Sequence, residues 1–254
     1  MVVNLERRKN YLLLSFNTEG KYNVFNSRFM IDMIDALDKV EKVRDVHYLV
    51  VRGENGNFGS GADIRELLKA STDKEYAKVF FGHMKDLFVK MMSINKVTIG
   101  LVENVAFGAS MELLLILDVV LAKSGTRFAA PGGKLGVFPP VLVSIGPYIL
   151  GHRASRKLAM LGEELDTKRA LGVGLIDQEV EDLDKGLVEI LERMKQMSPS
   201  SLVRMRKLIL FSLIPYLDKA FEELSTQVIT DEAREGIGSY LSKTSPSWTS
   251  VSFS

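Results

Sequence analysis

The order of apolar and polar positions predicts that strands and helices alternate along most of the chain. Short apolar runs typical of strands occupy residues 2–5, 11–16, 47–51, 97–102, 118–122 and 126–129. Apolar residues at helical spacing predict helices at residues 27–40, 76–91, 154–161, 167–171, 184–197, 201–211 and 217–230. The first two strands suggest a hairpin, and Ser27 is the expected cap of the first helix. The repeated order of strand, loop and helix indicates an α/β fold whose last third is mainly helical.

One small-residue turn stands out because a single acid follows it. Val105 to Leu113 connects the strand at 97–102 to the apolar run Leu113 to Leu117, so the turn forms a helix N-terminus. The free N–H groups there suit an anion or a carbonyl oxygen that gains charge. Glu112 follows Gly108 by four residues, about one helical turn. From this stretch alone, a tight helix contact with a paired structural acid is the preferred interpretation.

A second loop also offers free backbone N–H groups. Gly53 to Ile64 contains four glycines between a predicted strand and a helical pattern. It lacks the Lys-Ser/Thr ending of a P-loop and the GxGxxG spacing of a dinucleotide site. A plain tight turn is the alternative interpretation.

Two further segments allow a structural or a functional interpretation. The helix at 76–91 carries an apolar stripe that forms core or lines an apolar pocket: Val79, Phe80, Met84, Leu87, Phe88 and Met91. Pro131 to Pro140 is dense in turn-forming residues, so it is a functional loop or a simple connection.

Composition narrows the class of protein. The 254 residues carry a formal net charge of +1, which gives no global bias toward nucleic acid or membranes but leaves a local basic patch for phosphates open. Cysteine is absent, and no signal peptide or membrane-length apolar run occurs. His47, His83 and His152 lack metal-ligand spacing, and no GxSxG elbow is present. We expect a soluble cytoplasmic protein without a metal.

Several motifs together resemble those of the crotonase superfamily of enoyl-CoA hydratases and isomerases, over nearly the whole chain. The motifs that carry the resemblance are K-Y-N-V-F-N at 21–26, F-G-S-G-A-D-I-R-E at 58–66, A-F-G-A-S-M-E-L at 106–113, L-G-E at 161–163, G-L-I at 174–176 and the terminal E-G-I, Tyr240, Lys243 and P-S-W. The motif at 58–66 is more specific than the one at 21–26. Ala109 and Ser110 replace two glycines of the family pattern.

The resemblance implies a crotonase-like spiral of ββα repeats at 1–195 and a C-terminal helical region at 196–254. It implies a homotrimer or hexamer, a role in fatty-acid metabolism and a coenzyme A thioester as substrate. No further cofactor, nucleic acid or membrane partner is expected.

The resemblance also assigns site residues by position. The backbone N–H groups of Ala62 and Ala109 would form an oxyanion hole for a thioester enolate, and Glu112 would act as acid or base. The coenzyme would be lined by Val24, Ser60, Asp63 and Ile64, with Tyr240 and Lys243 near its outer part. Alanine fits these turns only if they do not need positive φ.

One departure affects the reaction. Hydratases of this family have a second catalytic glutamate at the position of Gly132, and hydration is helped by two carboxylates. Many isomerases of the family rely chiefly on that same second acid, so Gly132 weakens both assignments. The segment after Pro139 is also less glycine-rich than usual. The hypotheses are therefore a hydratase- or isomerase-like enzyme with Glu112 as its one acid, a decarboxylase or thioester hydrolase on the same fold, or a non-catalytic acyl-CoA-binding protein.

Overall fold

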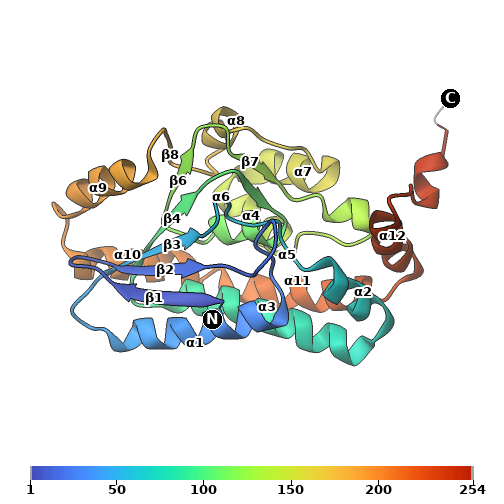
Figure 1. The fold of residues 1–254 in the computed structure, drawn as a ribbon, viewed down its shortest axis with the longest axis horizontal. Helices are drawn as coiled ribbons and strands as arrows, with labels where there is room; N and C mark the ends of the chain where they lie inside the picture. Colours follow the sequence, from blue (N-terminus) through green and yellow to red (C-terminus); the bar gives the residue numbers. More distant parts are fainter. Residues whose placement is uncertain (1, 253–254) are drawn as a thin grey trace.

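The computed structural model describes residues 2–252, whose strands form one six-stranded sheet and one two-stranded sheet (Figure 1). The large sheet has the order β1-β2-β3-β4-β6-β8, and the small one pairs β5 with β7. The strand bounds are β1 Val3–Arg7, β2 Leu12–Phe16, β3 Tyr48–Gly53, β4 Val97–Val102, β5 Val105–Phe107, β6 Val119–Lys123, β7 Arg127–Ala129 and β8 Gln178–Val180.

The large sheet is parallel except at its first edge. β1 and β2 form the antiparallel hairpin that the sequence predicts, and every later pair in this sheet is parallel. All six residues of β4 are buried, as expected for a central parallel strand covered on both faces. Because β3 and β4 are parallel, the loops that follow them leave the sheet at the same end of the strands.

Short strands form a second, smaller layer that begins after the C-terminal end of β4. β5 pairs with β7, and isolated bridges add Phe25 to Ala62 and Gly59 to Ala106. Successive turns of the chain thus contribute a long strand, a short strand and a helix. This arrangement is the predicted α/β spiral of ββα units.

Twelve α-helices and two 3₁₀ helices lie within the described residues. Their bounds are α1 Ser27–Lys42, α2 Ile64–Thr72, α3 Lys74–Ser93, α4 Ala109–Leu114, η1 Gly132–Leu135, α5 Pro140–Ser144, α6 Gly146–Ile149, α7 Gly151–Leu161, α8 Thr167–Gly172, α9 Leu183–Met194, α10 Pro199–Phe211, α11 Ile214–Gln227, α12 Asp231–Ser242 and η2 Ser247–Ser250.

Helices cover both faces of the large sheet. α1 and α3 lie below the sheet in Figure 1 and contribute a large share of the main core, which includes a cluster of phenylalanine rings. On the other face, α9 packs Leu183, Leu187 and Ile190 against β3, β4 and β6. α11 packs along α3, and α12 packs against α2 and η1. Buried apolar area on both faces stabilises the central strands.

The structure corrects three local predictions. Asn26, not Ser27, caps α1, because its side-chain oxygen accepts the N–H of Phe29, whereas the Ser27 hydroxyl donates to Glu66. α4 ends at Leu114, and the chain to Leu117 continues in tighter i to i−3 turns. Val79 is 54% exposed, because it lies about 100° around the helix from Phe80.

The C-terminal region is helical, as the sequence predicts, but α12, β8 and α5 were not anticipated. Their sequences are short or weakly periodic, so local pattern gives little signal. The boundary at residue 195 falls between α9 and α10 and stays a prediction. None of the described helices combines the length and the apolar character required to cross a membrane.

Candidate active site

The two loops singled out in the sequence are in direct contact. The N–H of Gly59 donates to the carbonyl oxygen of Val105 at 2.9 Å, and the N–H of Phe107 donates to the carbonyl oxygen of Gly59 at 2.9 Å. A Cβ on Gly61 would lie 2.8 Å from the carbonyl oxygen of Phe107 and 3.1 Å from Cα of Gly108. Gly61 also has a φ of 91°, so only glycine fits this contact.

Ser110 fastens the same contact through its side chain. Its hydroxyl oxygen accepts the N–H of Gly61 at 3.1 Å, and the residue is fully buried. Ser110 replaces a glycine of the family pattern, so this chain has a hydrogen bond between the loops that glycine cannot make. Sequence reasoning noted the replacement but did not anticipate its partner.

Ala62 and Ala109, one from each loop, line a single cavity of about 80 Å³. Within residues 2–252 neither amide N–H has a hydrogen-bond acceptor. Positive φ falls on the neighbours Gly61 and Gly108, not on Ala62 or Ala109. Alanine is therefore tolerated at both positions.

The cavity is lined entirely by apolar side chains and backbone. Its walls come from the two loops, α2, α3, α11 and the segment 137–140: Ala62, Leu67, Phe81, Met84, Gly108, Ala109, Ala130, Gly132, Val137, Phe138, Pro139, Pro140 and Leu224. Met84 thus lines an apolar pocket, one of the two roles foreseen for its stripe. An apolar enclosure strengthens a hydrogen bond to a developing charge, because water does not compete there.

Gly132, at the position of the second acid, lies in the cavity wall. A Cβ there would be 3.1 Å from Cα and the carbonyl carbon of Phe138 and 3.2 Å from the carbonyl oxygen of Val137. The backbone at 137–138 therefore occupies the space in front of Gly132. A longer side chain at this position would require that backbone to move.

Glu112 lies on α4 with only 2% of its surface exposed, and it meets the N-terminus of α5. Its Oε1 accepts the backbone N–H groups of Val141 at 2.6 Å and Leu142 at 2.9 Å. Oε2 accepts no hydrogen bond from a described residue, so it is the oxygen left to exchange a proton. Glu112 itself does not line the cavity, although its neighbours Ala109 and Pro140 do.

Burial raises the pKa of Glu112 to about 7 from its ordinary value of 4.5. The two N–H bonds oppose this effect, because they favour the ionised carboxylate, but they do not offset the loss of hydration. A carboxyl group that titrates near neutral pH is suited to both giving and taking a proton.

The predicted coenzyme-lining residues fall into two groups. Val24 adjoins the strip formed by Ser60, Asp63 and Ile64, because residues 23–25 pair with residues 60–63 through backbone hydrogen bonds. The Asp63 side chain caps α2 by accepting the N–H groups of Arg65 and Glu66. Tyr240 and Lys243 lie at the exposed C-terminal end of α12, the helix that packs against α2.

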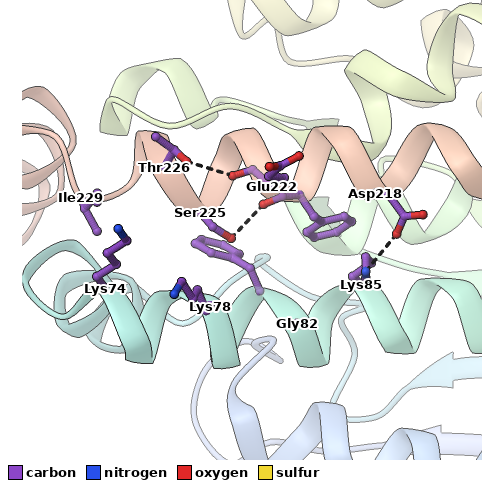
Figure 2. A pocket seen from close by; sticks show the side chains of 11 residues that line it. Lys74, Lys78, Gly82, Lys85, Asp218, Glu222, Ser225, Thr226 and Ile229 are labelled. Atoms are coloured by element: carbon purple, nitrogen blue, oxygen red, sulfur yellow. Dashed lines mark hydrogen bonds and ion pairs between the residues drawn. The ribbon is translucent and has the colours of Figure 1, made fainter.

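A larger hollow of about 380 Å³ lies between α3 and α11 (Figure 2). The ion pair of Lys85 with Asp218, at 2.9 Å, links the two helices. None of the predicted site residues lines this hollow. Phe81 lines both spaces, but only the smaller cavity is lined by Ala62 and Ala109, so the amide-lined cavity is the candidate site.

Sequence reasoning singled out the segment after Pro139 as a departure that reshapes the acyl pocket, but it missed the contact of this segment with Glu112. Val141 and Leu142 bind Glu112 through their backbone, so their side chains give no signal. No cluster of three or more potential metal ligands occurs among residues 2–252.

Comparison with known proteins identifies the family. A model of the enoyl-CoA hydratase/isomerase family matches residues 6–251. The chain is 24% identical to 2,3-dehydroadipyl-CoA hydratase of Escherichia coli over 95% of this chain and 96% of that protein. It is 24% identical to ethylmalonyl-CoA decarboxylase of Pongo abelii over 87% of this chain and 75% of that one.

Solved structures agree at the level of the fold. An enoyl-CoA hydratase from Bacillus halodurans has a TM-score of 0.87 at 19% identity, covering 94% of this chain and all of that chain. As the motifs at 58–66 and 106–113 indicated, the chain belongs to the enoyl-CoA hydratase/isomerase family, whose fold is that of the crotonases.

Proposed function

We propose that this protein is an enzyme that stabilises the enolate of an acyl-CoA thioester, with hydratase- or isomerase-like chemistry. The observation that carries the proposal is the pair of unpartnered amides, at Ala62 and Ala109, in one apolar cavity. Two N–H donors aimed at the thioester oxygen lower the energy of the negative charge that develops there. The size of the cavity, about 80 Å³, favours a short acyl group.

Glu112 supplies the proton transfer in this proposal. In the isomerase-like reaction it takes a proton from the substrate carbon beside the thioester, the electrons move to the thioester oxygen, and the acid returns the proton two carbons further along. One carboxyl group suffices for that exchange. Hydration also requires a second group that activates water, and the position of the family's second acid is held by Gly132 in the cavity wall. Isomerisation is therefore the preferred form.

Decarboxylation is the second candidate, because the apolar lining favours loss of a charged carboxylate as neutral CO₂. The electrons of the broken C–C bond would pass to the thioester oxygen, and protonated Glu112 would then donate a proton to the enolate carbon. The relative named as ethylmalonyl-CoA decarboxylase makes this reaction class worth testing.

A panel of thioesters separates the candidates. Purified protein is incubated with crotonyl-CoA, a 3-enoyl-CoA, a 2-alkylmalonyl-CoA and a saturated acyl-CoA, and the products are identified by mass spectrometry. A 2-enoyl product from the 3-enoyl substrate supports isomerisation. Coenzyme A thioester binding without turnover of any substrate would leave the non-catalytic interpretation.

Glu112→Gln tests the role of the acid, because glutamine retains an oxygen that can accept the N–H groups of Val141 and Leu142. We expect turnover to fall about 100-fold or more with little change in substrate binding. Asp177→Asn is the matched control, since this carboxylate also accepts a backbone N–H, that of Val120, and does not line the cavity. An active Glu112→Gln enzyme would reduce Glu112 to the cap of α5.

We also propose that the protein forms a homotrimer or hexamer. α10 presents an exposed apolar strip of Met205, Leu208 and Ile209, of which Leu208 is 80% exposed. An apolar strip of this kind is typical of a surface that another chain covers. Light scattering after size exclusion gives the mass, and a monomer would refute the proposal.

A further inference from the structure

A basic hollow lies at the end of the sheet opposite to the candidate active site. Its walls include His47 and Lys96, which precede β3 and β4, whereas the loops of the active site follow those strands. Each strand has six residues, so the two ends are separated by roughly 20 Å. Figure 1 shows α10 and the end of α1 on the left, the side from which β2 and β3 start.

Four cations from three segments surround this hollow of about 670 Å³. Arg44 follows α1, Lys96 precedes β4, and Arg204 and Lys207 come from α10. The one carboxylate in the lining is Glu41, whose side chain pairs with Lys90 at 2.8 Å. Four positive charges less one negative charge leave three, although the whole chain has a net charge of only +1.

These cations lack counter-ions within the described part of the chain. None of the four has a carboxylate within 4.0 Å, and Lys207 contacts only the ring of Phe211. Elsewhere in the described chain about half of the Lys and Arg side chains form ion pairs, as Lys85 does with Asp218. The concentration of unpaired charge in one hollow favours an anionic ligand.

Lys96 provides the strongest evidence for an anion site, because only 2% of its surface is exposed. Its ammonium group donates to the carbonyl oxygen of Val43, and an ammonium group has three N–H donors. Burial lowers the pKa of Lys96, while Asp45 and Glu41 act in the opposite sense from a distance. A buried cation with one neutral acceptor gains most from an anion that approaches it.

The lining also limits the chemistry of the ligand. Val203 is its one aliphatic side chain, and Phe, Tyr and Trp are absent from it, so an acyl chain or a stacked run of bases has little to contact. Arg and Lys together bind phosphate oxygens well, Arg through two parallel hydrogen bonds and Lys as a point charge. A diphosphate group places several negative charges in a compact volume. We propose that this hollow is a second ligand site, separate from the thioester cavity, that binds a diphosphate-bearing anion.

The face of α10 that lines the hollow differs from its apolar strip. Arg204 and Lys207 are three residues apart and share one face, whereas Ile209 lies on the opposite side of the helix and Leu208 borders Arg204. Both charges can therefore be removed without deleting a side chain of the apolar strip.

Isothermal titration of the full chain with sodium pyrophosphate tests the proposal, with sodium sulfate at equal ionic strength as the reference anion. We expect pyrophosphate to bind more tightly than sulfate. The double variant Arg204→Gln/Lys207→Gln should bind pyrophosphate about tenfold more weakly or worse, because it loses two charge-assisted interactions.

The matched control is Arg153→Gln/Arg156→Gln on α7, which removes two exposed positive charges from another hollow. Its affinity for pyrophosphate should change by no more than about twofold. Arg44→Gln removes a cation from the opposite wall and should also weaken binding. Circular dichroism and size exclusion of each variant establish that fold and mass are unchanged.

Three results would overturn the proposal. They are equal losses in the α10 and α7 double variants, equal affinity for pyrophosphate and sulfate, and tighter binding of a single-stranded RNA than of pyrophosphate. ADP and coenzyme A are further titrants, since both carry a diphosphate, and only the part of their binding that the α10 double variant loses is assigned to the hollow. Thioester turnover should be the same in the α10 variant as in the wild type, so failure of the proposed enzyme function would not affect this test.

Discussion

Two ionisable side chains are buried to nearly the same degree, and their surroundings differ. Arg206 is 3% exposed and Glu112 is 2% exposed. Arg206 donates to the carboxylate of Asp118 at 2.6 Å and to carbonyl oxygens of Met91, Met92 and Ile94 at the end of α3. Glu112 has two backbone N–H donors, and no cation pairs with it among the described residues.

This difference separates a structural charge from a reactive one. Arg206 is paired with a carboxylate and donates four hydrogen bonds, so its burial joins α10 to the end of α3 and to Asp118, which precedes β6. Glu112 keeps a pKa near 7 because nothing nearby offsets its desolvation fully. A buried acid without a counter-ion retains a proton that it can give to a substrate.

The largest expected effect on stability comes from removing the guanidinium group of Arg206. Arg206→Met should lower the free energy of unfolding by about 3–5 kcal/mol, because it leaves Asp118 and three carbonyl oxygens without their donor. Urea denaturation measures this loss, and Arg206→Lys, which keeps the charge, should cost less. A loss below about 1 kcal/mol would show that the ion pair contributes little net stability.

The pH dependence of stability tests whether Glu112 keeps its proton in the folded protein. Glu112 has a folded pKa of about 7 and an ordinary value of 4.5, so its contribution to stability is complete below pH 4.5 and is lost as the pH rises through 7. Relative to Glu112→Gln, the wild type should lose about 3 kcal/mol over this window. Denaturation of both proteins at several pH values measures the difference, and a constant difference would mean that the folded carboxylate is already ionised at pH 5.

The smallest expected effect concerns the bond that holds the two loops together. Ser110→Ala removes the acceptor for the N–H of Gly61 and should lower the free energy of unfolding by about 1 kcal/mol. Turnover should fall as well, since Ala62 and Ala109 follow and precede the joined residues. Ser225→Ala on α11 is the control, because that hydroxyl bonds only within its own helix. Equal effects of the two changes would contradict a role for Ser110 in positioning the loops.

The sequence by itself determined the fold class and the two loops. Alternation of apolar runs with helical spacing identified the hairpin, β4 and most helices, because these patterns reflect which faces are buried. The motifs at 58–66 and 106–113 identified the family, and the family model bears this out. The roles of Glu112, Tyr240 and Lys243 stay predictions.

Only the tertiary structure decided what each site residue meets. Glu112 binds N–H groups 29 and 30 residues further along, and Gly132 is covered by the backbone of Phe138. Backbone groups carry no sequence signal, since every residue has them. The basic hollow likewise joins the end of α1, the start of β4 and α10, which are far apart in the chain. Net charge conceals such a cluster, because only folding brings its members together.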